Sequence, residues 1–112
     1  MQNQNQWIDI IKELKNFKSD YQLAKYWQVP TTVIHQYRTE RMRLPIALCL
    51  EIAELGYYHP LEIILSLEYP RAKATHQERI LQMYWLATMA NAGNRMSARA
   101  FSRKYYRFNF KR

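Results

Sequence analysis

The sequence predicts an all-α protein, and three observations favour this class. Only two of the 112 residues are glycine, 48% are hydrophobic, and apolar side chains recur at three- and four-residue spacing along most of the chain. That composition is sufficient for one hydrophobic core in a chain of this length.

No apolar run approaches the roughly 20 residues of a membrane span. The polar N-terminus lacks the pattern of a secretory signal, so we expect a cytoplasmic protein that contacts no membrane.

Two helices are expected before residue 28. The first follows a polar lead of five residues, ends near Asn16, and has its apolar positions at Trp7, Ile10, Ile11 and Leu14. The second begins after Ser19, which is followed three residues later by Gln22. This spacing is typical of a capping box, in which each side chain bonds the main-chain amide of the other residue. The apolar face of the second helix consists of Leu23, Ala24 and Trp27.

A tight turn of three or four residues should separate this helix from a third one. Gln28 and Val29 interrupt the apolar period, Pro30 excludes a continuous helix, and Thr31 or Thr32 can cap the next helix. Periodicity places one set of its residues inward, Val33, Ile34 and Tyr37, and another outward, Thr31, Thr32, His35 and Gln36. Two short helices joined in this way are typical of proteins that place the second helix in the DNA major groove.

Three more helices are expected downstream. Pro45 can open a fourth helix from Ile46 to Leu55 that Gly56 terminates, and His59 with Pro60 opens a fifth through about Glu68. A short linker then leads to a second capping box, formed by Thr75 and Glu78. The sixth helix should run from about Gln77 to Asn91 and end at residues 92–94, which include Gly93.

Five of these residues carry a resemblance to a known family. Leu23, Ala24, Val29, Ile34 and Pro45 follow the pattern of the phage-repressor and Cro class, also called lambda repressor-like helix-turn-helix proteins. Residues 46–67 are similar to that family's fourth and fifth helices, so the likeness covers about residues 5 to 68. The resemblance implies a five-helix, repressor-like helix-turn-helix head over residues 1–70.

The chain departs from the family pattern at the turn and at the loop after the third helix. Gln28 and Glu40 stand at positions where glycine is common. A left-handed backbone at either residue costs roughly 1 kcal/mol relative to glycine. We therefore expect either a reshaped turn or strain that the core absorbs.

The expected DNA contacts divide into bases and backbone. The resemblance assigns base contact to Thr31, Thr32 and His35, and the outward Gln36 can pair with adenine. Expected backbone contacts come from two places, the start of the second helix and the loop after the third: Lys18, Ser19, Gln22, Arg38, Arg41 and Arg43. Asp20 opposes an anion at the first of these places. The alternative is a solvated surface helix and loop with no ligand.

Positive charge is concentrated at the C-terminal end. Residues 1–78 carry nine Lys or Arg and nine Asp or Glu, whereas residues 79–112 carry eight Lys or Arg and no acid. This asymmetry indicates a polyanionic partner, either nucleic acid or an anionic membrane surface.

The sixth helix has a broad apolar face. Its members are Ile80, Leu81, Tyr84, Trp85, Leu86 and Met89. A monomeric core helix is one interpretation. Homodimerisation through residues 71–94 is the other, and it is favoured because the resembled class commonly dimerises and one helix-turn-helix buries little surface on DNA. The predicted dimer contacts are Ile80, Leu81, Tyr84, Trp85 and Met89.

Residues 95–112 form a basic aromatic tail. Seven Lys or Arg alternate there with five aromatic residues, and from Tyr106 the aromatics recur at every second position, a strand period. One interpretation is a frayed, solvated terminus. The other is an arm whose Arg99, Arg103, Lys104 and Arg107 contact nucleic acid or a partner.

Catalytic motifs are absent from the sequence. The three histidines are far apart, the single Cys49 fits a small core residue, and no phosphate loop can be written with two glycines. We expect no enzyme activity, no metal or cofactor and no small-molecule substrate.

The combined expectation is a transcriptional regulator of the phage or mobile-element type in the bacterial nucleoid or a phage-infected cell. It would bind double-stranded DNA at an inverted-repeat operator as a homodimer. Repression is expected in preference to activation. The alternative is a non-catalytic interaction protein that binds a protein or RNA through the sixth helix and the tail. A third reading is membrane-surface binding through the tail.

Overall fold

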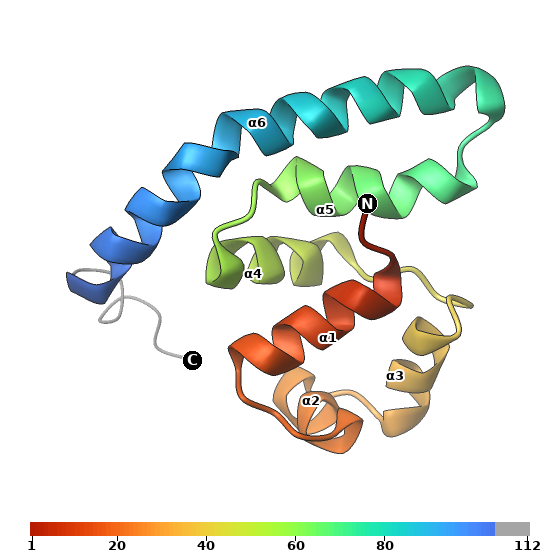
Figure 1. The fold of residues 1–112 in the computed structure, drawn as a ribbon. Coiled ribbons are helices and arrows are strands. Elements are labelled where there is room, and N and C mark those ends of the chain that lie inside the picture. The colour runs from red at the N-terminus through yellow and green to blue at the C-terminus, as the bar shows by residue number, and fades with distance from the viewer. Residues whose placement is uncertain (105–112) are drawn as a thin grey trace.

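The computed structural model describes residues 1–104, and side chains as far as Asn91. Within this range the chain forms six α-helices, one short 3-10 helix and no strand, so the all-α expectation is confirmed (Figure 1). The helices are α1 (Gln4–Leu14), α2 (Asp20–Trp27), α3 (Thr31–Arg38), α4 (Ile46–Gly56), α5 (Pro60–Glu68) and α6 (Ala74–Lys104), with the 3-10 helix at Tyr69–Arg71.

The core lies between the first five helices, and α6 runs along α5 on the outside of this group (Figure 1). Helix α1 buries Trp7, Ile8 and Ile11 because this spacing places them on one face. The indole nitrogen of Trp7 donates to Ser66 Oγ of α5 at 2.7 Å, so its polar atom is satisfied in the core. Trp7 therefore links the N-terminal helix to α5.

Helix α1 begins at Gln4, two residues earlier than expected. Asn3 and Gln6 form a complete capping box, with each main-chain amide donating to the other side chain at 2.7 and 2.8 Å. Residues 1–5 lack apolar periodicity, which is why a polar lead was expected there. The cap accounts for the difference, since it satisfies amides that the helix itself leaves without partners.

The cap of α2 forms in part. Ser19 Oγ accepts from the Gln22 amide at 3.2 Å, as expected, but the Gln22 side chain accepts from the amide of Lys18 instead of Ser19. At the next helix, Pro30 is the capping residue, and no side chain bonds the first turn. The expectation that Thr31 or Thr32 caps α3 is wrong, because both threonines already have helical backbone.

The two positions that depart from the glycine pattern both adopt left-handed backbone. The φ angle is 57° at Gln28 and 59° at Glu40. The Gln28 amide donates to carbonyls of α2, and the next amide, of Val29, donates to Ala24 at 3.0 Å. The turn therefore keeps the left-handed geometry that ends a helix, at roughly 1 kcal/mol per residue relative to glycine.

Gly56 is the last residue of α4, but its backbone is not left-handed. The left-handed residue is Tyr57, with φ 59°. A Cβ atom on Gly56 would collide with the ring of Tyr58, which packs edge-on against Trp7 at a centroid distance of 5.0 Å. Glycine is needed here for close approach, a reason that a sequence pattern does not display.

Helix α6 is longer at both ends than expected. It begins at Ala74, one residue before Thr75, so Thr75 is not its cap. It also continues through Gly93 to Lys104, and the predicted end at residues 92–94 is wrong. One glycine costs a helix only about 1 kcal/mol relative to alanine, which the surrounding helix-forming residues offset. Among the described residues, no helix is both long and apolar enough to cross a membrane.

Candidate nucleic-acid interface

Helix α3 presents its polar residues outward as expected. Ile34 and Tyr37 are buried, Val33 and Gln36 are half-buried, and Thr31, Thr32 and His35 are exposed. The turn of residues 28–30 holds α3 against α2, where the ring of Trp27 meets that of Tyr37 edge-on at 6.4 Å. The outward side chains are polar groups that can exchange hydrogen bonds with base edges or phosphates.

Gln4 of α1 fixes the end of α3 and the loop that follows. Its amide nitrogen donates to the carbonyls of Tyr37 at 2.9 Å and Met42 at 2.7 Å, and its oxygen accepts from the Leu44 amide at 3.2 Å. Gln4 is 2% exposed, so these bonds are shielded from water. Sequence reasoning missed this residue, and the only available signal was the Asn3–Gln6 cap that places it in a helix.

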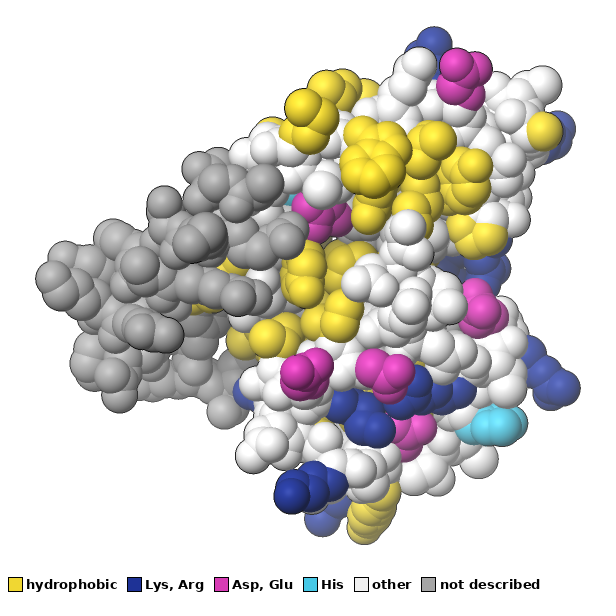
Figure 2. Space-filling view, in the orientation of Figure 1, with side chains coloured by type: hydrophobic (Ala, Val, Ile, Leu, Met, Phe, Trp, Pro, Cys, Tyr) yellow, Lys and Arg dark blue, Asp and Glu magenta, His cyan; other side chains and the backbone are white. Residues whose placement is uncertain are grey.

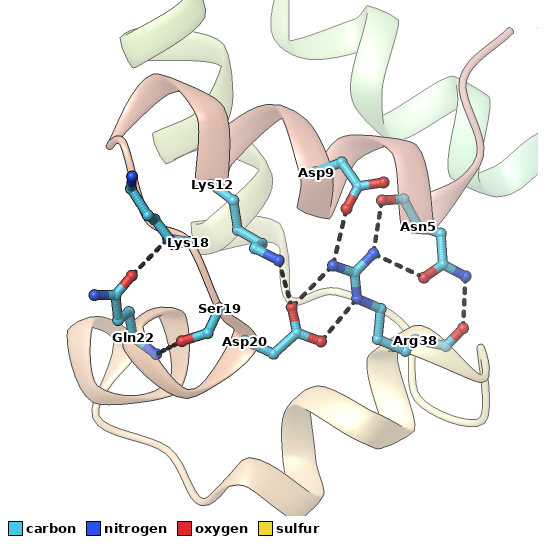
Figure 3. Close-up of polar contacts among 8 residues, drawn as sticks. All are labelled: Asn5, Asp9, Lys12, Lys18, Ser19, Asp20, Gln22 and Arg38. Atoms are coloured by element: carbon cyan, nitrogen blue, oxygen red, sulfur yellow. Dashed lines mark hydrogen bonds and ion pairs between the residues drawn. The ribbon is translucent and has the colours of Figure 1, made fainter.

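Arg38, at the end of α3, is held by α1 and α2 (Figure 3). Its guanidinium donates to both oxygens of Asp20 at 2.9 and 3.1 Å and pairs with Asp9 at 2.8 Å. It also donates to Asn5 Oδ1 at 3.1 Å, while Asn5 donates to the Arg38 carbonyl at 2.6 Å. Arg38, predicted to contact phosphate, is thus engaged in an internal network, which joins residues too far apart in sequence to be recognised as partners.

The same network also sets the ionisation of Asp20 at the start of α2. Hydrogen bonds from Arg38 lower the pKa of Asp20 from 3.8 to about 2; burial acts in the opposite direction, and Lys12, 2.9 Å away, lowers it further. The carboxylate is ionised at neutral pH but is balanced by two cations. Its opposition to an anion near Ser19 is correspondingly reduced.

The remaining expected backbone contacts lie on exposed positions. Lys18, Ser19 and Gln22 are exposed around the first turn of α2. Arg41 is exposed and has no hydrogen bond or ion pair from its side chain to another described residue, while its amide donates to the Gln36 carbonyl at 3.0 Å. Arg43 instead pairs with Glu68 at 2.7 Å. Arg41 is thus the arginine of this loop best placed to meet an added anion.

The predicted dimer residues of α6 divide between its two sides. Ile80, Leu81 and Tyr84 are half-buried on the side of the buried Ala87, which packs toward α5. Trp85 and Met89 are 53% and 72% exposed, and they share the outer side with two further apolar residues, Met83 and Leu86. We call Met83, Trp85, Leu86 and Met89 the outer stripe. Figure 2 shows hydrophobic side chains gathered over α5 and α6.

The tail predictions fall largely beyond the description. Arg99, Arg103 and Lys104 belong to α6 by backbone, and their side chains lie outside the described residues, as do Arg107 and the alternating aromatics.

In the described part of the chain, no three metal-ligating side chains come together. Cys49 is buried in the core, and burial raises its thiol pKa to about 11.

No protein-family model matches this chain, and neither a curated protein nor a solved structure matches it.

Proposed function

We propose that this protein is a sequence-specific DNA-binding transcriptional regulator whose α3 lies in the major groove. The observation that carries the proposal is the α2–turn–α3 pair, in which α3 buries Ile34 and Tyr37 while Thr31, Thr32 and His35 remain exposed. A helix that contacts bases must be held in a fixed position, because base-edge hydrogen bonds depend on its placement. Gln4 and Arg38 hold α3 in position through hydrogen bonds that join it to other helices.

On this proposal, α1–α5 form a repressor-like helix-turn-helix head. Thr31, Thr32 and His35 contact bases, with Gln36 beside them. Lys18, Ser19, Gln22 and Arg41 contact the sugar-phosphate backbone. Arg38 is assigned a positioning role, and Arg43 reaches DNA only by leaving Glu68.

The protein acts as a homodimer on an inverted repeat, joined through the outer stripe of α6. Four exposed apolar residues on one side of a helix support this contact, because burying them in a two-fold interface removes apolar area from water. Occupation of promoter DNA would repress transcription in the bacterial nucleoid. The resemblance to phage and mobile-element regulators supports repression over activation.

The decisive experiment is selection of bound duplexes from a random pool with the full chain. We expect an enriched inverted repeat with half-site centres about 34 Å apart along the DNA axis. His35→Ala should cost about 1–3 kcal/mol at one base position per half-site, whereas Arg41→Ala should weaken selected and random duplexes alike. A pool with no enriched sequence, or equal losses on both duplexes for His35→Ala, would contradict the proposal.

The second candidate is a non-catalytic interaction protein that binds protein or RNA, and the outer stripe also favours it. Competition between structured RNA and the best selected duplex for binding to the chain distinguishes the two functions. If the chain binds structured RNA as tightly as the best selected duplex, or binds no duplex above the random pool, this candidate replaces the first.

A further inference from the structure

The junction between α5 and α6, residues 69–73, lies against the loop that follows α3. Arg71 Nη2 of the junction donates to the carbonyl of Glu40 in the loop at 3.3 Å. A second contact joins the same two regions, since Arg43 of the loop pairs with Glu68 at the end of α5 at 2.7 Å. The junction is therefore an extension of the surface assigned to DNA, although it is remote from that surface in sequence.

Both sides of this contact are fixed by the fold. On the side of the loop, the amide of Arg41 donates to the Gln36 carbonyl of α3 at 3.0 Å. On the side of the junction, the Gln77 side chain of α6 donates to the Tyr69 carbonyl at 3.0 Å. Arg71 is therefore carried by a segment that is held in position relative to α3.

The Arg71 side chain can still bind an anion. It is exposed, and the bond to Glu40 is the one hydrogen bond or ion pair that joins it to another described residue. A guanidinium has five N–H donors, so most of them remain available, and their planar arrangement matches two oxygens of a phosphate. Lys73 is also exposed, and its side chain has no hydrogen bond or ion pair to a described residue.

Positive charge is in excess where the loop and the junction meet. The charge of Glu68 is already matched by an arginine, and Glu40 is the remaining acid. The exposed cations there are Arg41, Arg71 and Lys73, which outnumber the single Glu40 carboxylate. An excess of cations on a surface that continues from α3 attracts a polyanion.

We propose that the α5–α6 junction is a second phosphate-binding surface for double-stranded DNA, with Arg71 as its principal contact. The Arg71 guanidinium donates to one backbone phosphate, beside the phosphate that Arg41 contacts, and Lys73 adds to the local positive field. This inference rests on the proposed function, because α3 in the major groove brings the loop and the junction to the DNA. Phosphate contacts carry no sequence information, so Arg71 strengthens binding to every duplex without changing the preferred bases.

The test measures binding of the full chain to a random-sequence duplex and to the selected duplex at several salt concentrations. Arg71→Gln should reduce the slope of log K against log salt by about 0.9 on both duplexes, the value for one phosphate contact. The double variant Arg41→Gln, Arg71→Gln should reduce it by about 1.8, since each arginine neutralises its own phosphate. The urea midpoint of Arg71→Gln should equal that of the parent, because Arg71 is exposed.

Arg79→Gln is the matched control. It removes the same charge from the first part of α6, at a residue that is also exposed. Gln77 is directed at Tyr69, and residues two apart lie on different sides of a helix, so Arg79 faces away from the junction contact. Light scattering of each variant checks that the oligomeric state is that of the parent, since Arg79 lies one turn before Met83 of the outer stripe.

A reduced slope for Arg71→Gln, with the parent slope kept in Arg79→Gln, supports the inference. An unchanged slope for Arg71→Gln overturns it, as does an equal reduction in both variants. A loss of affinity confined to structured RNA also overturns it and indicates an RNA partner. A chain that binds the random duplex but enriches no sequence contradicts the proposed function alone, because the slope can still be measured; a chain that binds no duplex contradicts both.

Discussion

Replacing Arg38 by methionine should destabilise the fold by about 2 kcal/mol at neutral pH. The Arg38 side chain is only 21% exposed, and its guanidinium donates to Asp20, Asp9 and Asn5. Loss of one partner from a buried ion pair costs roughly 3–5 kcal/mol, but the two carboxylates here are 63% and 40% exposed and can be rehydrated. Methionine keeps the apolar part of the side chain, so the effect reports the charged group.

The pH dependence of this loss follows from Asp20. Its pKa falls from 3.8 to about 2 in the folded protein. That difference corresponds to at most about 2 kcal/mol, and solvent screening of a carboxylate that is 40% exposed reduces it to roughly 1 kcal/mol. Because the folded pKa is lowered, this stability is fully present above pH 3.8 and is lost as the pH falls toward 2.

The assay is urea unfolding followed by circular dichroism at several pH values from 6 to 2, on the parent and on Arg38→Met. The gap in unfolding free energy should narrow below about pH 4. Arg41→Met is the control, since Arg41 is exposed and should change stability by less than about 0.5 kcal/mol. A gap that is constant across this range, or an equal loss in the control, would refute the network.

The same pair of variants separates positioning from contact on DNA. If the proposed function holds, Arg41→Met should reduce the slope of log K against log salt by about 0.9. Arg38→Met should leave the slope unchanged, because its donors are directed at carboxylates of the fold.

Three further predictions concern the outer stripe, a tight contact and a strained turn. Trp85→Glu should convert a dimer to a monomer in light scattering, while Thr75→Glu, at an exposed position in the first turn of α6 outside the outer stripe, should not; a parent chain that is monomeric at high concentration would end the dimer proposal. Gly56→Ala should lower the unfolding free energy by about 1–3 kcal/mol, since the new Cβ displaces the ring of Tyr58, and an unchanged thermal midpoint would show that this ring moves freely. Gln28→Gly should raise the unfolding free energy by roughly 1 kcal/mol by relieving a φ of 57°; a lower urea midpoint would mean that contacts of the Gln28 side chain outweigh the strain.

Local chemistry made the helix boundaries near proline predictable. Pro45 and Pro60 stand at the starts of α4 and α5 as predicted, because proline has no amide to donate and its φ suits the first turn. The ends of α6 were not predictable from the same signals. A glycine in a helix costs too little to stop it, so Gly93 carried less information than its identity suggested.

The inward face of α6 shows a second limit. Apolar residues at three- and four-residue spacing predicted one broad face, yet Ile80 and Tyr84 turn toward α5 while Trp85 and Met89 remain outside. Periodicity identifies an amphipathic helix but cannot divide a wide apolar arc between a core and an interface. The position of α5 determines which apolar residues of α6 are buried and which remain exposed.

The three arginines at residues 38–43 show why a candidate site needs the fold as well as the sequence. All three have the same chemistry, but Arg38 is enclosed by acids of α1 and α2, Arg43 is paired with Glu68 of α5, and Arg41 extends into solvent. Each environment is created by residues remote in the chain, which local pattern cannot reveal. Since a phosphate competes with existing carboxylates for a guanidinium, the cost of recruiting Arg38 exceeds that of recruiting Arg41. If the proposed function holds, the order in which these arginines reach a phosphate is therefore set by the partners that each one already has, with Arg41 first and Arg38 last.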